Sequence, residues 1–150
     1  MAPGWNYKTE LQWGLLQYPG HSGMKHCIQK LNELYRTEPA LYEKQFEPGC
    51  FEWVDLNHRS ESVLVFMRKG KKEKDNMLVI LNVTPVVRNN WEIYVHGKGK
   101  WTEIFNSDTK EFWGTGDVFN PSIPSELVDK PSKCYKIKVH LPALGAIVLR

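Results

Sequence analysis

The sequence predicts a mainly β protein, an antiparallel β-sandwich preceded by a short α-helical segment. Two observations predict it. After residue 50, short runs of alternating apolar and polar residues are separated by clusters of turn residues. Before residue 40, apolar residues instead recur at spacings of four and three, as in one amphipathic helix. The length of 150 residues suffices for one domain, and the 41% apolar and 25% charged composition fits a globular core with a charged surface.

The helix is predicted from one apolar stripe of about four turns. We expect it to begin at His21 or Ser22, and to end before Pro39, which disfavours helical geometry at the preceding residue. The stripe should pack on one side, or leave an apolar surface that promotes association. It consists of Met24, Ile28, Leu31 and Tyr35, widened by Cys27 and Leu34.

After the helix, the sequence predicts seven short strands. The clearest is Cys134–Leu141, in which every second residue is apolar, so this strand should be half exposed. The run from Met77 to Leu81 is apolar on both faces and predicts a central strand. We expect a solvated hairpin loop at the basic run 68–75 and turn structure throughout 114–132. The expected strands are 51–55, 62–68, 77–84, 91–96, 101–107, 134–141 and 143–149.

Composition argues against several functional classes. A formal charge of +3, mostly spread along the chain, is too small to indicate a nucleic-acid partner. No apolar run approaches the roughly 20 residues of a membrane-spanning helix, and the first residues lack the pattern of a signal peptide. Cys27, Cys50 and Cys134 match neither a zinc spacing nor a disulfide framework, which indicates reduced thiols in a cytoplasmic protein.

No catalytic constellation is recognisable. Glu52 and Asp55 are the tempting carboxylate pair for a glycosidase, but their opposite parity in a strand should direct them to opposite faces of the sheet. Nucleophile elbows, phosphate-binding glycine loops and Cys/His pairs are absent from the sequence. The five histidines have no zinc-binding spacing. We therefore predict neither a catalytic residue nor a metal site.

Tryptophans offer candidate sugar contacts, because their flat faces stack on apolar C–H surfaces. Trp91 shares a strand face with Ile93 and is expected in the core. Trp101 opens a strand after a glycine-rich turn, and Trp113 lies in a loop. Either residue could be a surface platform or a packing group, and packing is favoured for both.

Specific strings identify a family that the chain resembles. They are His21-Ser22-Gly23, Leu31-Asn32-Glu33-Leu34-Tyr35, Glu38-Pro39-Ala40-Leu41, Phe51-Glu52-Trp53-Val54-Asp55, Asn82-Val83-Thr84-Pro85-Val86 and Asn106-Ser107-Asp108. In this order the strings resemble the C-terminal region of bacterial 1,4-α-glucan (glycogen) branching enzymes. The resemblance covers nearly the whole chain, although Tyr42, Val83 and Phe112-Trp113 depart from the usual family pattern.

The resemblance implies a division of the chain. Residues 1–43 resemble the helical end of the catalytic barrel, and residues 44–150 resemble the C-terminal all-β domain, of Greek-key type, of the α-amylase clan. The parent enzyme would transfer α-1,4-glucan chains to form α-1,6 branches. Its catalytic carboxylates would lie upstream, so this chain alone should be inactive.

The resemblance also implies partners and contact residues. It implies no cofactor, and as partners α-glucan (glycogen) and the catalytic barrel of the same chain, without nucleic acid or membrane. Trp5 and Asn6 would belong to a loop near the substrate cleft, so they join Trp101 and Trp113 as candidate substrate contacts. The alternatives are a freestanding carbohydrate-binding module and a protein-interaction β-sandwich, the latter recognisable by an exposed apolar patch.

Overall fold

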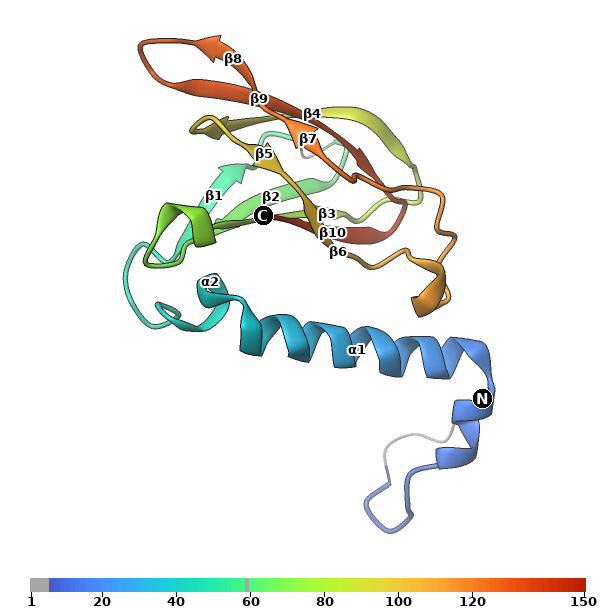
Figure 1. The fold of residues 1–150 in the computed structure, drawn as a ribbon. Coiled ribbons are helices and arrows are strands. Elements are labelled where there is room, and N and C mark those ends of the chain that lie inside the picture. Colours follow the sequence, from blue (N-terminus) through green and yellow to red (C-terminus); the bar gives the residue numbers. More distant parts are fainter. Residues whose placement is uncertain (1–5, 59) are drawn as a thin grey trace.

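The computed structural model describes residues 6–58 and 60–150, which form a helical layer, two main antiparallel sheets and a two-stranded pair (Figure 1). The helical segment contains a 3-10 helix η1 (Trp13–Gln17), the long helix α1 (Pro19–Thr37) and the short helix α2 (Pro39–Tyr42). Two further 3-10 helices lie in loops between strands, η2 (Glu73–Asp75) and η3 (Lys110–Phe112). None of the helices in the described part of the chain has the length and apolar character needed to cross a membrane.

The strands pair in three groups, all antiparallel. The larger sheet has the order β1-β2-β3-β10-β6, the smaller sheet has the order β4-β9-β8, and β5 pairs with β7. This arrangement confirms the predicted mainly β, antiparallel fold. The strands are β1 (Phe51–Asp55), β2 (Val63–Arg68), β3 (Met77–Asn82), β4 (Arg88–His96), β5 (Lys100–Trp101), β6 (Glu103–Asn106), β7 (Ile123–Pro124), β8 (Glu126–Asp129), β9 (Cys134–Leu141) and β10 (Gly145–Leu149).

A hydrophobic core fills the space between the two sheets. It alternates along each strand with residues of the outer faces, as the period of two requires. At burial coefficients of about 25 cal/mol per Å², this contiguous core is the main stabilising contribution to the sandwich. Its buried members are Val63, Val65, Leu78, Ile80, Ile93, Val95, Ile123, Ile137, Val139, Leu141, Ile147 and Leu149.

A second, smaller core lies between the helices and the outer face of the larger sheet. Leu34 and Ala40 from the helices pack there against Met77, Phe105 and Val148 from the strands. At the junction of α1 and α2, Arg150 Nη1 donates to both carboxylate oxygens of the buried Glu38, at 2.9 and 2.8 Å. The helical segment is therefore anchored to the sandwich by apolar packing and by one ion pair.

The apolar stripe predicted for α1 is only partly packed: Cys27 and Leu34, which widen it, meet the sheet, whereas its four main residues are exposed. Met24 has 63% of its surface exposed, and Ile28, Leu31 and Tyr35 are also exposed. The docked row lies one residue earlier along the helix and consists of Gly23, Cys27 and Leu34. Periodicity identifies an amphipathic helix but not which of two adjacent rows meets the sheet. The helix thus docks on the sandwich and also leaves an apolar surface.

Several element boundaries differ from the sequence prediction. The expected strand 101–107 is divided into β5 and β6, which belong to different sheets, and the expected strand 91–96 begins earlier, at Arg88. Helix α1 begins at Pro19 rather than at His21 or Ser22, because proline is well tolerated in the first helical turn, where its missing N–H costs no hydrogen bond. The segment 114–132, expected to consist of turns, contains β7 and β8. All four residues of β8 are exposed, so the strand lacks the apolar alternation by which strands are recognised.

Candidate functional site

A continuous row of paired residues crosses the outer face of the larger sheet. Strand register pairs Trp53 with Phe66, Phe66 with Val79, Val79 with Val148, and Val148 with Phe105. Paired residues share a face, so all five side chains point away from the sandwich core. The helices cover the Val79, Val148 and Phe105 end of the row, while Trp53 at the β1 end remains 50% exposed.

Three aromatic rings form a cluster at this open end, which we term the aromatic platform: Phe51, Trp53 and Phe66. The Phe51 and Phe66 rings stack with centroids 5.2 Å apart, and Trp53 meets both edge-on, at 4.9 and 5.9 Å. These are favourable arrangements for aromatic pairs. The platform is thus a packed, partly exposed aromatic surface on the edge strand β1 and its neighbour β2.

Sequence reasoning did not select the platform as a site. The string Phe51-Glu52-Trp53 places both rings on one strand face, which was the available signal. Whether that face is core or surface depends on strand order and on where the helices end. Because β1 is an edge strand and α2 ends at Tyr42, the face is open.

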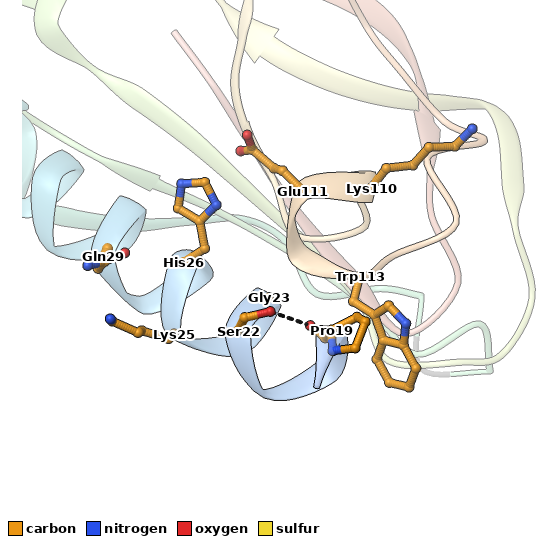
Figure 2. Close-up of a pocket in the computed structure, with 9 residues that line it drawn as sticks. All are labelled: Pro19, Ser22, Gly23, Lys25, His26, Gln29, Lys110, Glu111 and Trp113. Carbon is orange, nitrogen blue, oxygen red and sulfur yellow. Dashed lines mark hydrogen bonds between the residues drawn. The ribbon is translucent and has the colours of Figure 1, made fainter. Parts of the chain in front are cut away.

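A groove of about 460 Å³ lies between the first turns of α1 and the turn at η3 (Figure 2). Trp113 stands at one end, 71% exposed, directly after η3. Gly20 and Gly23 permit the close contact of α1 with this turn. A Cβ atom at Gly20 would lie 2.9 Å from the Trp113 ring, and one at Gly23 would lie 2.7 Å from the Phe112 backbone.

Of the four residues predicted from the sequence to contact substrate, the three in the described part of the chain are not brought together. Trp5 lies outside the described residues. Asn6 is exposed, and its Oδ1 accepts from the Lys8 N–H at 3.0 Å in a local turn. Trp101 packs against the core between the sheets, with Nε1 buried and lacking a hydrogen-bond partner. Trp113 is the exposed tryptophan of the groove, and substrate contact by these four residues stays a prediction.

The carboxylate pair considered in the sequence engages separate partners. Glu52 forms an ion pair with Lys69, whereas Asp55 Oδ2 lies 3.0 Å from His58 Nε2. A bulge between Trp53 and Asp55 breaks the strict alternation on which the parity argument relied. Register pairs Glu52 with Met67 and Asp55 with Val65, which share one face of β2, so the prediction of opposite faces is wrong. The two carboxylates differ instead in their basic partners.

Metal-ligand geometry does not occur in the described ranges, where no group of three or more His, Cys, Asp and Glu side chains could hold an ion. The resolved pKa shifts concern surface hydrogen bonds and one thiol. Burial raises the pKa of the Cys27 thiol, on the docked row of α1. A hydrogen bond from Lys136 lowers the pKa of Glu92.

A family model described as "Alpha amylase, C-terminal all-beta domain" matches residues 53–150, from β1 to the end of the chain. The chain belongs to this family. The match covers both sheets of the sandwich and excludes the helical segment. Membership agrees with the observed antiparallel strands and with the resemblance of the sequence to the C-terminal region of branching enzymes.

Curated relatives match nearly the whole chain. The 1,4-alpha-glucan branching enzyme GlgB of Aquifex aeolicus is 39% identical over 97% of this chain and 23% of its own length. The enzymes of the same name from Oceanobacillus iheyensis and Cereibacter sphaeroides are 42% and 40% identical, over 97% and 95% of this chain and 23% and 20% of their own lengths. The chain therefore spans about a fifth of the length of these relatives.

Among solved structures, the crystal structure of an α-amylase from H. orenii matches with a TM-score of 0.46 and 22% identity. The match covers 83% of this chain and 19% of that one.

Proposed function

We propose that this chain is the C-terminal part of a 1,4-α-glucan branching enzyme, and that it carries none of the catalytic carboxylates of its parent. The parent would be a glycosyltransferase that moves α-1,4-glucan chains to form α-1,6 branches. The observation that carries the proposal is the match to branching enzymes along 95–97% of this chain and only about a fifth of theirs. The chain itself would support the rest of the enzyme and contact glucan.

The proposed division assigns residues 1–43 to the edge of the catalytic barrel and residues 44–150 to the all-β domain. Two observations support it. The last helix of the helical segment ends at Tyr42, and the family match begins at residue 53. The exposed stripe of α1, formed by Met24, Ile28, Leu31 and Tyr35, is the surface that we propose packs against the barrel.

Glucan contact is best supported at the aromatic platform. The exposed Trp53 indole, fixed by Phe51 and Phe66, offers an apolar ring surface on which the C–H face of a sugar can stack. The platform lies on an edge strand, where a long polymer can approach from the side. We propose glycogen as the ligand, and neither nucleic acid nor membrane, because the charge of +3 is small and spread out. All three cysteines are free thiols, which supports a cytoplasmic setting.

Affinity electrophoresis of the 150-residue chain in gels containing glycogen tests the contact. The wild-type chain should be retarded, and Trp53→Ala should lose most of the retardation while its circular dichroism spectrum is unchanged. Trp91→Phe, a substitution at a tryptophan packed against the core, is the matched control. Equal retardation of the wild type and Trp53→Ala would remove the platform from the proposal.

An activity assay of the isolated chain tests the proposal that it carries no catalytic carboxylates. The chain should leave the iodine absorbance of amylose unchanged, because no carboxylate pair for glycosyl transfer is expected in it. Branching by the purified chain would overturn the assignment to a non-catalytic part.

A freestanding carbohydrate-binding module is the second candidate, and one observation favours it. Such a module should have a helix that closes over its own sandwich, and α1 does cover the outer face of the larger sheet. The exposed stripe of α1 favours the branching-enzyme assignment instead. The genomic reading frame upstream of Met1 decides between them, since it either encodes a catalytic barrel or does not.

A further inference from the structure

The groove between α1 and η3 is separate from the aromatic platform and has its own exposed tryptophan. We propose that this groove is a second contact site for an α-1,4-linked glucan chain, with the Trp113 indole as the stacking surface. The proposal takes its class of ligand from the proposed function. It rests on the presentation of Trp113, on the polar residues that line the groove with it, and on the position of the groove.

Trp113 is held in place by its backbone. Its φ and ψ of 69° and 24° are left-handed, and its N–H donates to the Lys110 carbonyl at 3.0 Å. The next residue, Gly114, lies so close to Asp108 that a Cβ there would be 2.3 Å from the Asp108 carbonyl oxygen. Only a glycine fits this turn, so the backbone beside Trp113 has little freedom. An exposed ring on a fixed backbone loses little entropy when it binds.

The edge of the Trp113 ring rests on α1 at Gly20. The absent side chain at Gly20 leaves the space that the indole occupies, at 2.9 Å from where a Cβ would stand. Figure 2 shows the indole beside Pro19 at the start of the helix. This edge of the ring is thereby supported by the helix start, while 71% of the residue stays exposed.

The rest of the groove is polar and of mixed charge. Helix α1 contributes Ser22, Lys25, His26 and Gln29, and the turn contributes Lys110 and Glu111. Hydroxyl groups both donate and accept hydrogen bonds, so they need donors and acceptors together, as here. Pro19, Gly23 and the Trp113 ring contribute apolar surface beside these polar groups, and a simple anion would meet Glu111. One aromatic face with a mixed polar wall suits a sugar ring.

The position of the groove relative to the platform matters for a polymeric ligand. In Figure 1, β1 and the turn at η3 lie toward opposite ends of α1. A glucan chain or two branches of one glycogen particle can engage both surfaces. Two linked contacts bind more tightly than either alone, because the second becomes intramolecular.

The test follows each tryptophan separately by nuclear magnetic resonance of the six indole N–H groups, assigned through single Trp→Phe variants of the 150-residue chain. Titrated maltoheptaose should shift the Trp113 signal saturably, in the wild type and in Trp53→Ala. Gly20→Ala should weaken this response about tenfold, because its methyl displaces the indole from its support. Gly14→Ala, where a Cβ would have no neighbour within 4 Å, should leave it unchanged.

The outcomes separate the two glucan surfaces. A shift of Trp113 without one of Trp53 supports the groove and counts against the platform. A shift of Trp53 without one of Trp113 overturns the groove and leaves the proposed function standing. An equal response of Trp113 to cellohexaose, whose linkages are β-1,4, would overturn the assignment to α-glucan.

Discussion

At the scale of single residues, one buried carboxylate ties the helical segment to the end of the last strand. Glu38 is 8% exposed, and Arg150 Nη1 is hydrogen-bonded to both of its oxygens. Removing one partner of such a pair leaves a desolvated charge, which costs more than an exposed pair gains. Removal of Arg150 should therefore destabilise the protein, because it leaves the buried Glu38 carboxylate without a partner.

Arg150→Ala should lower the free energy of unfolding by about 1–2 kcal/mol, because the Glu38 carboxylate loses its partner while half of Arg150 already faces solvent. Urea unfolding followed by fluorescence measures the change. The control is Glu33→Gln, which breaks the exposed Lys30–Glu33 pair and should lower the free energy of unfolding far less than Arg150→Ala does. If the two substitutions lowered the free energy of unfolding equally, the buried Glu38–Arg150 pair would stabilise the protein no more than an exposed pair does.

A second residue-level prediction concerns pH. Lys136 donates to Glu92 across strands β4 and β9 at 2.9 Å, and this hydrogen bond lowers the pKa of Glu92 from its ordinary value of 4.5. A carboxylate with a lowered folded pKa contributes stability above its unfolded pKa. The contribution is lost as the pH falls through the folded pKa.

Glu92→Gln should therefore lower the urea midpoint at pH 7 and have no effect once the pH lies below the folded pKa of Glu92. Urea titrations of the wild type and the variant, repeated from pH 7 down to below the folded pKa of Glu92, measure the difference between their midpoints. Glu73→Gln, on the η2 loop outside the β4–β9 ladder, is the control. A midpoint difference that stays constant down to acidic pH would show that the hydrogen bond is not its cause.

The sequence pattern predicted which residues are buried better than it predicted which exposed residues form a binding surface. The alternation in Cys134–Leu141 defined β9 at both ends, and its apolar residues Ile137, Val139 and Leu141 are buried. Trp53 was not singled out, because its exposure depends on β1 being an edge strand, which alternation does not encode. The groove at Trp113 depends on the approach of α1 to η3, between residues about 90 positions apart in the chain.

At the scale of elements, α1 has two apolar rows and uses one of them. Gly23, Cys27 and Leu34 dock, while the neighbouring row from Met24 to Tyr35 stays exposed. A helix that is apolar on both rows is typical of one packed between two layers. The sequence contained both rows, but the choice between them was made by the small Gly23, which lets the η3 backbone approach.

Exposed apolar surface on α1 should cause the isolated chain to self-associate. Ile28→Lys should suppress association and the binding of a dye for apolar surfaces, with stability changed by less than about 0.5 kcal/mol because the site is exposed. Light scattering over a concentration series measures association. Gln29→Lys adds the same charge at the next position, which is also exposed, and should not suppress it. A wild-type chain that stays monomeric at high concentration with little dye binding would contradict the prediction.

At the scale of the whole molecule, the two proposed parts of the chain are physically coupled. The helical segment supplies Leu34 and Ala40 to the second core, where they cover Met77 and Phe105 of the larger sheet. The resemblance divides the chain at residue 43, but the packing crosses that division. We therefore expect residues 6–150 to unfold as one cooperative unit rather than as a helix followed by a sandwich.

Deleting residues 1–43 tests this coupling. The deletion exposes Met77 and Phe105, and at roughly 2 kcal/mol for each uncovered side chain the sandwich should lose about 4 kcal/mol. It also leaves Arg150 without Glu38. Because whole domains are stable by only about 5–15 kcal/mol, the shortened chain should be marginal and prone to aggregate.

In the full chain, unfolding curves from far-ultraviolet circular dichroism and from tryptophan fluorescence should coincide. If the helical signal were lost first, and residues 44–150 alone kept the stability of the full chain, the helical segment would be an attachment rather than part of the fold.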